Sequence, residues 1–118
     1  MAMIVNRYIN AVNLALNPFL EGLDGSIATL WSYAVSLRQI TVRLQRHGER
    51  SNNHLVCLAC TKIAAPTQWD RARIRIVIDA ASTTPDPLYR ICDEGEGVIM
   101  CCGVIQLVEN VEPFYEVP

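Results

Sequence analysis

Residues 71–79 carry apolar side chains at every even position and arginine at three of the odd positions, and this pattern constrains the fold more than any other part of the chain. Successive side chains of a β-strand point to opposite faces of the sheet. The segment is therefore predicted to be a half-buried strand with a core face and an arginine-lined face. The residues on the two faces are Ala72, Ile74, Ile76 and Ile78, and Arg71, Arg73 and Arg75.

Turn-forming residues divide the rest of the chain into short apolar runs that are also typical of strands. Candidate strands lie at 39–46, 54–63, 88–92 and 98–108, with turn-rich segments at 47–53, 64–70 and 83–87 and a hairpin loop at 93–97. Strands at this spacing predict a mainly β (or α+β) fold, as a small antiparallel β-sandwich or barrel. A chain of 118 residues suits a single domain (1–118), with a β-rich core at 30–108 and an extended tail at 109–118.

Residues 27–37 match two templates at once. Their apolar residues fit a helix that Ser26 caps, yet from Trp31 onward they also alternate as in a strand. The alternation resumes one residue out of phase after 38–39, as it does where a β-bulge interrupts a strand. We favour two strands in line, at 30–37 and 39–46, over the helix.

Residues 3–16 are predicted to form an amphipathic helix, because apolar residues recur at 3.6-residue spacing on one side and asparagines gather on the other. Asn17-Pro18 should end it, since the residue before a proline avoids the helical conformation. The polar side carries a single cation, Arg7, so packing on protein is favoured over a membrane surface. Candidates for docking onto a partner are Tyr8 and Val12 in this helix and Phe114 and Tyr115 in the tail.

The chain shows no sign of membrane insertion or secretion. No segment approaches the ~20 apolar residues of a membrane-spanning helix, and polar residues interrupt the N-terminal segment where a signal peptide needs a continuous apolar block. Five cysteines, an odd number, suit reduced thiols better than a complete set of disulfides. We therefore expect an intracellular, cytoplasmic protein.

Cys57 and Cys60 have the two-residue gap of a zinc knuckle. Knuckles lie on tight turns, whereas here the gap lies inside an apolar run, and in a strand the two thiols would point to opposite faces. We therefore favour buried structural thiols over zinc, and zinc over a redox pair, because nothing suggests the strand-to-helix setting that lowers a thiol pKa. No cofactor is expected.

Charge is distributed unevenly along the chain. Residues 1–75 carry nine arginines and lysines against four acids, a net of +5, whereas residues 76–118 carry one arginine against eight acids, a net of −7. Two interpretations follow: basic and acidic strands face each other inside one fold, or complementary surfaces of different subunits meet.

The arginine-lined face of 71–79 is the clearest candidate for binding, and Arg43 and Arg46 would extend it if their strand pairs nearby. Arginines two apart on a strand are separated by roughly 6.6 Å, a spacing that suits successive carboxylates or phosphates. Aromatic residues, which single-stranded nucleic acids also need, are missing from the face itself. We favour pairing with acids of the same fold over a protein interface, and that over nucleic acid; the acids are Asp79, Asp86, Asp93, Glu94 and Glu96.

No catalytic motif is present: Gly-x-Ser-x-Gly, a phosphate-cradling glycine loop and His-Glu-x-x-His are all missing. Together with the apolar composition and the opposed charges, this predicts a non-enzymatic interaction or assembly protein that self-associates as a homo-oligomer, such as a small viral accessory, matrix or coat-like component. The first alternative is an RNA- or DNA-binding module that uses Arg71, Arg73 and Arg75. The second is a zinc-stabilised small domain built on Cys57 and Cys60.

Overall fold

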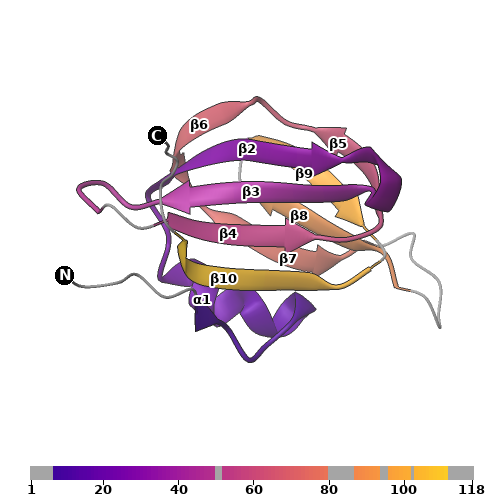
Figure 1. Cartoon of the computed structure of the whole chain (residues 1–118), viewed down its shortest axis with the longest axis horizontal. Helices are drawn as coiled ribbons and strands as arrows, with labels where there is room; N and C mark the ends of the chain where they lie inside the picture. Colours follow the sequence, from indigo (N-terminus) through magenta and orange to yellow (C-terminus); the bar gives the residue numbers. More distant parts are fainter. Residues whose placement is uncertain (1–6, 50–51, 80–86, 94–95, 102, 112–118) are drawn as a thin grey trace.

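The computed structural model describes residues 7–49, 52–79, 87–93, 96–101 and 103–111, which fold into two antiparallel β-sheets packed face to face (Figure 1). In the order of hydrogen-bonded neighbours, the six-stranded sheet contains β1 (Arg7–Tyr8), β10 (Ile105–Val111), β4 (Asn52–Cys57), β3 (Gln39–Gln45), β2 (Ser26–Ala34) and β6 (Gln68–Ala72). The four-stranded sheet contains β5 (Cys60–Ala64), β9 (Glu96–Cys101), β8 (Tyr89–Asp93) and β7 (Ile74–Ile78). The mainly β, antiparallel fold expected from the sequence is confirmed.

The core lies between the two sheets and is built from the inward-facing residues of each strand. In the six-stranded sheet one cross-strand row consists of Val42, Leu55 and Leu107, all nearly inaccessible to solvent. The four-stranded sheet contributes a second buried row, made of Ile76, Ile91 and Ile99. Burying one such side chain stabilises a fold by about 1.5–3 kcal/mol, so these rows are expected to carry much of the packing energy.

Two stacked corners carry the chain from one sheet to the other. Leu58 and Ala59 connect β4 to β5, and Ala59 has a φ of 56°, which turns the chain out of the strand. Gly103, between β9 and β10, packs on this corner so closely that a Cβ there would lie 2.6 Å from the Leu58 carbonyl oxygen. The Leu58 N–H donates to Val104, and the Gly103 N–H donates to Leu58. The single strands predicted at 54–63 and 98–108 are therefore wrong, because each run bends between two sheets.

The segment 71–79 is likewise divided between two sheets rather than forming one strand. β6 ends at Ala72, β7 begins at Ile74, and Arg71 has a φ of 54°. The backbone N–H of Arg73 leaves the ladder and donates to Asp93 Oδ2 at 2.7 Å. The predicted apolar phase holds for Ala72, Ile74 and Ile76, which are buried, but Ile78 is 51% exposed at the end of β7.

β2 and β3 form a hairpin, not two strands in line. A short 3-10 turn (Val35–Leu37) and Arg38, at a φ of 49°, reverse the chain, so that Ala34 pairs with Gln39. The change of phase at 38–39 is therefore this turn, and the register shift of β2 lies at Trp31, between Leu30 and Ser32. The helix alternative is wrong for 27–34, which belong to β2.

The N-terminal helix exists, but it lies later than the predicted 3–16. A 3-10 turn (Asn13–Leu16) runs directly into α1 (Asn17–Glu21), nine residues in all, while Arg7 and Tyr8 pair with β10 as β1. Pro18 lies in the first turn of α1, where its missing N–H costs no hydrogen bond, so Asn17-Pro18 begins the α-helix instead of ending it. Residues 1–6 and 112–118 lie outside the described part, and 109–111 belong to β10.

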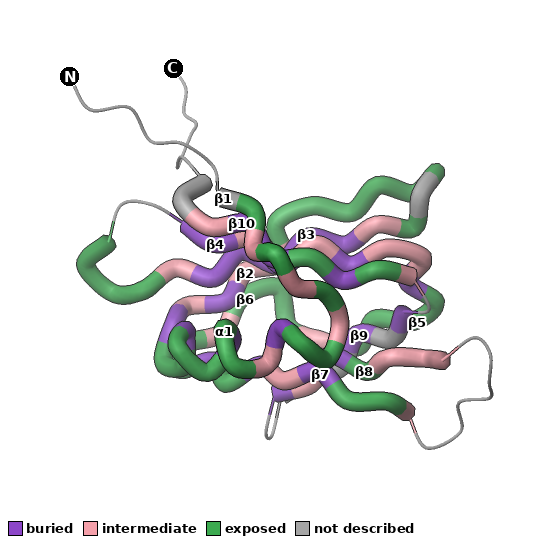
Figure 2. Tube along the Cα trace, turned by 90° about the horizontal axis from the view of Figure 1, so that it is seen from below, coloured by how far each residue is buried: buried purple, intermediate pink, exposed green. Residues whose placement is uncertain are grey.

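Two asparagines, Asn13 from the predicted polar side and Asn17 from the predicted end of the helix, join the two sheets. Asn17 lies beside β7, where its Nδ2 donates to the Ile76 carbonyl and its Oδ1 accepts from the Ile76 N–H, both at 2.8 Å. Asn13 Oδ1 accepts from the N–H of Ile105 in β10 at 2.7 Å. Figure 2 shows this helical segment across the side of the sandwich, between β10 and β7. We call Asn13 and Asn17 the asparagine clasp; the leucines buried with it are Leu16, Leu20 and Leu23.

None of the helices among the described residues is long and apolar enough to cross a membrane.

Asn17→Ala should lower the free energy of unfolding by about 2–3 kcal/mol, because it leaves the partly buried N–H and C=O of Ile76 without their side-chain partner. Urea unfolding followed by circular dichroism measures this. Asn10→Ala is the matched control, since Asn10 is exposed and lies outside the clasp. Equal stability of the two variants would contradict a structural role for the Asn17 amide.

Candidate functional site: an aromatic–arginine face and a basic groove

The outer face of the six-stranded sheet carries a continuous row of side chains that point away from the core. Arg43 pairs with Thr29 on one side and with His54 on the other. His54 pairs with Val108, which pairs in turn with Tyr8 at the sheet edge. No helix among the described residues lies over this face (Figure 1). Among the described residues, no second layer therefore covers this face.

Trp31, Arg43 and His54 form one stack on this face. The guanidinium carbon of Arg43 lies 3.4 Å from the centroid of the Trp31 ring, a cation–π contact. Arg43 Nε donates to His54 Nε2 at 3.0 Å, and the ring centroids of Trp31 and His54 are 6.2 Å apart. Arg43 is only 9% exposed, whereas Trp31 is 46% exposed. We call Tyr8, Trp31, Arg43 and His54 the aromatic–arginine face.

His54 is held neutral by this arrangement. Burial of the ring, followed by the nearby charge of Arg43, lowers the pKa of His54 to about 4. The hydrogen bond from Arg43 also requires a neutral His54, because Nε2 can accept it only when that nitrogen carries no proton.

Acid should destabilise the protein through His54. Its pKa of about 4 in the fold lies below the ordinary value of 6.5, so between these values the unfolded chain binds the proton more readily. The free energy of unfolding should therefore fall as the pH decreases through this window, by about 1–2 kcal/mol after allowance for the partial exposure of the ring. Urea unfolding at several pH values measures the slope.

His54→Gln should flatten this dependence, because glutamine takes up no proton but still offers an acceptor to Arg43. His47→Gln is the control, since His47 is exposed and pairs with Asp70 instead. If His54→Gln kept the full acid dependence, the neutral role of His54 would be refuted.

The predicted arginine-lined face of 71–79 is occupied by an acid from the basic half of the chain. Arg75 makes two 2.8 Å contacts with the carboxylate of Asp24, and Arg73 Nε lies 3.9 Å from the same group. The hydrogen bond from Arg75 holds the pKa of Asp24 below its usual range. Asp24 was not among the acids considered from the sequence, because only the fold brings its loop beside β7.

The other predicted members of the arginine face lie elsewhere. Arg71 is exposed at the end of β6, and Arg46 donates to the Gly22 carbonyl and pairs with Glu49. Arg43 lies on the outer face of the other sheet. The predicted extension of one arginine patch by Arg43 and Arg46 is therefore wrong, because β3 and β7 belong to different sheets.

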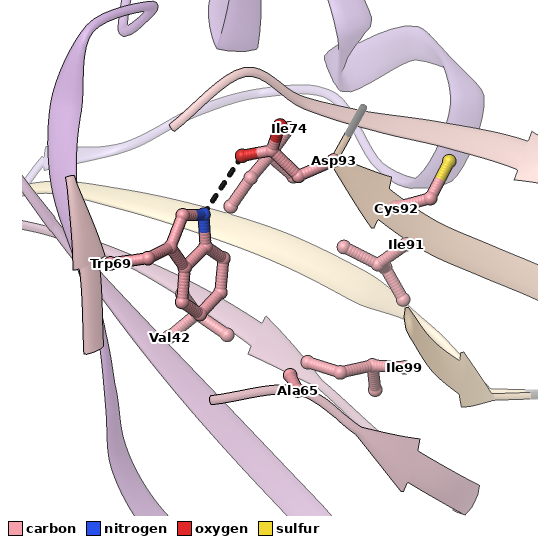
Figure 3. A pocket seen from close by; sticks show the side chains of 8 residues that line it. All are labelled: Val42, Ala65, Trp69, Ile74, Ile91, Cys92, Asp93 and Ile99. Carbon is pink, nitrogen blue, oxygen red and sulfur yellow. Dashed lines mark hydrogen bonds between the residues drawn. The ribbon is translucent and has the colours of Figure 1, made fainter. Parts of the chain in front are cut away.

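Asp93 is a buried carboxylate with a structural role. Its Oδ2 accepts from Trp69 Nε1 at 2.8 Å as well as from the Arg73 backbone, next to a cavity of about 10 Å³ (Figure 3). A cavity of this size holds about one water at most. Asp93 therefore fastens the β6–β7 crossing. It also pairs with Glu96, so β8 and β9 pair antiparallel as the predicted hairpin requires; residues 94–95 of the predicted loop lie outside the described part.

The cysteines of the Cys57-x-x-Cys60 segment converge, contrary to the expectation that they point to opposite faces. The turn at Ala59 places Cys57 on β4 and Cys60 on β5, so they do not share one strand. The Cys60 thiol lies 3.4 Å from the Cys57 carbonyl oxygen. Cys101 stands opposite Cys60 in the β5–β9 ladder. No group of three or more His, Cys, Asp or Glu side chains in the described part of the chain is arranged to hold a metal ion.

A groove of about 440 Å³ opens beside Cys60. It lies at the end of the sandwich where the β2–β3 turn meets β5. Its lining combines apolar and basic side chains, principally Tyr33, Ile40, Ile63, Arg38 and Lys62. The sequence did not point to this groove, because its members come together only through the hairpin and the corner.

Of the four predicted docking residues, the structure describes Tyr8 and Val12. Tyr8 is 71% exposed and belongs to the aromatic–arginine face, and Val12 is 45% exposed just before the helical segment. Phe114 and Tyr115 lie outside the described residues. Trp31 and His54 were not among the candidates, because their proximity to Arg43 depends on the register of β2, β3 and β4.

Comparison with known proteins identifies no relatives: no family model matches the chain, and neither a curated protein nor a solved structure matches it.

Proposed function

We propose that this protein is an interaction and assembly protein that self-associates through the aromatic–arginine face. The observation that carries the proposal is the combination of two exposed aromatic residues, Trp31 and Tyr8, with a nearly buried arginine on an uncovered sheet. Tryptophan, tyrosine and arginine are the residues that most often carry binding energy in protein interfaces. An ordered arginine also loses little side-chain entropy on binding, because Trp31 and His54 already hold it.

A second copy of the chain suits this face better than an unrelated partner. Six strands at about 4.8 Å spacing make a surface about 25 Å wide, and strands of seven to nine residues such as β3 and β2 are about 23–30 Å long. The resulting area of about 600–750 Å² approaches the ~800 Å² per partner of a standard interface. Sheets pack face to face readily, and a twofold axis would bring the same row of both copies together. The contact would place the Trp31 rings near the centre, because Trp31 lies over a middle strand of the sheet.

Trp31→Ala should weaken self-association at least about tenfold, because it removes the exposed ring and uncovers Arg43. Tyr8→Ala should weaken it less, since Tyr8 lies at the edge strand. Sedimentation velocity over a concentration series measures both effects. Phe19→Ala is the matched control, because Phe19 is similarly exposed, at 42%, but lies on α1 and not on the face.

A monomer at high micromolar concentration, in both low and high salt, would contradict the proposed self-association. An unchanged association constant in Trp31→Ala, with Phe19→Ala weakened, would place the interface elsewhere. Circular dichroism of each variant separates loss of contact from loss of fold.

Single-stranded nucleic acid is the second candidate, because an aromatic ring beside a guanidinium is a platform on which bases stack. The version that uses Arg71, Arg73 and Arg75 has less support, since Asp24 already engages two of these side chains. Fluorescence anisotropy with a labelled single-stranded oligonucleotide at rising salt tests this function. Absence of binding at low salt would dismiss it.

A further inference from the structure

Three cysteines meet where the two corners stack. Cys57 ends β4, Cys60 begins β5, and Cys101 ends β9 directly opposite Cys60. The thiols of Cys101 and Cys57 both lie within hydrogen-bonding reach of Cys60. None of the three is in a disulfide. The corner therefore gathers three sulfur atoms that the proposed interface does not use.

Cys60 is the member of this group that a small molecule can reach. It lies in the wall of the basic groove, which Ile40 and Lys62 also line, and keeps 5% of its surface accessible. Cys57 and Cys101 are fully buried behind it. A reagent that enters the groove would thus meet Cys60 first.

The surroundings of Cys60 favour its thiolate. Hydrogen bonds from the Cys101 and Cys57 thiols lower its pKa, and the backbone N–H of Ile40 and the charge of Arg38 add to the effect against the opposing cost of burial. In the protonated form Cys60 donates to the Cys57 carbonyl, at 3.4 Å, which favours the thiol. Three donors and a cation outweigh this one long contact. Cys57 shows the opposite trend, because the neighbouring sulfurs raise its pKa.

We propose that Cys60 is a redox-reactive nucleophile whose groove admits small hydroperoxides, and that Cys101 resolves the oxidised Cys60 as an intramolecular disulfide. The Cys60 thiolate attacks one oxygen of the peroxide, the O–O bond breaks, and Cys60 becomes a sulfenic acid. The departing hydroxide or alkoxide takes up a proton. The Cys101 sulfur then gives up its proton and attacks the Cys60 sulfur, so that the S–S bond forms and water leaves. Two electrons pass from the two thiols to the peroxide.

The register of the sheet selects Cys101 as the resolving thiol. Residues directly opposite in an antiparallel ladder have Cα atoms about 4.5–5.5 Å apart, which lies within the range of about 4.4–6.8 Å that disulfides span. Cys60 and Cys101 are such a pair. The bond would tie β5 to β9 beside the Gly103–Leu58 contact, and a thiol reductant would reverse it.

The test uses the full chain, first reduced and assayed for bound zinc, then treated with hydrogen peroxide, alkylated and mapped by mass spectrometry. Trypsin leaves Cys57 and Cys60 on one peptide, residues 51–62, and Cys92, Cys101 and Cys102 on another, residues 91–118, so fragmentation within both peptides must assign the linked sulfurs. We expect a crosslink from Cys60 to Cys101 that disappears in Cys60→Ser. Cys92→Ser is the matched control, since Cys92 lies on the neighbouring β8 and should not alter the product.

Absence of a crosslink, or one through Cys57 or Cys92, would overturn the proposal. So would about one zinc ion per chain that has to be removed before these thiols react, because the cluster would then be a metal site. Wild-type protein alone answers these questions, so they do not depend on the folding of a variant. They are also independent of self-association, which the sedimentation experiments measure separately.

Alkylation kinetics test the environment of Cys60. In the wild type, the rate of Cys60 alkylation by iodoacetamide should change little between about pH 8 and pH 6, whereas an ordinary thiol of pKa ~8.5 slows about tenfold per unit. Arg38→Gln should slow the reaction several-fold near neutral pH. Arg71→Gln is the matched control and should leave the rate unchanged, because Arg71 is also exposed and also has a positive φ but does not line the groove. A steep pH dependence in the wild type would show that Cys60 is an ordinary buried thiol.

Discussion

The backbone of β7 needs a partner on its outer side, and the Asn17 side chain supplies it. β7 is an edge strand, so the N–H and C=O of Ile76 point away from the four-stranded sheet into a partly buried region. Unpaired polar groups in such a place cost more than a hydrogen bond normally contributes. One primary amide satisfies both groups, and in the opposite sheet Asn13 Oδ1 accepts from the N–H of Ile105. The asparagine clasp therefore protects an edge and joins the two layers in one step.

The segments that cover the sides of the β-sandwich determine which of its surfaces remain open for binding. The helical segment closes one side of the sandwich, and its leucines complete the core there. Elsewhere the chain itself crosses between the sheets, at the two stacked corners and at the β6–β7 crossing that Asp93 fastens. The outer face of the six-stranded sheet keeps its regular surface, with Trp31 over Arg43. The stacked corners have a separate consequence, because they bring the thiols of Cys57, Cys60 and Cys101 together beside the groove.

Local patterns in the sequence predicted the class of fold and the phase of most strands. The alternation at 72–76 correctly separated core residues from exposed ones, because burial of one face is a local property of a strand. The crossings between sheets were not predictable in the same way. Ala59 and Arg71, at two of these crossings, and Arg38, in the β2–β3 turn, adopt positive φ values without the glycine that usually marks such positions. The runs around them therefore read as continuous strands. Asn13 was assigned to a polar side for a similar reason, since an asparagine that binds a backbone group has the same sequence pattern as a solvated one.

The candidate site depended still more on long-range geometry. Arg43 was singled out from the sequence, but as part of an arginine patch, whereas its real neighbours are Trp31 and His54. Those contacts follow from the β2–β3–β4 register, which no local pattern specifies. Asp24 likewise reaches Arg75 across 51 residues of sequence. The charge pattern therefore singled out Arg43 and Arg75 as candidates, but it did not predict which residues contact them.

The most direct test of this account is native-state hydrogen exchange, followed by NMR, at the amides of Ile76 and Ile105. Both N–H groups donate to asparagine side chains, so a stable clasp requires that they exchange only when the whole molecule unfolds. We predict protection close to that of the amide of Val42, in the middle of the six-stranded sheet. Exchange of either amide orders of magnitude faster than at Val42 would show that the clasp opens on its own, and would contradict the claim that it holds the two sheets together.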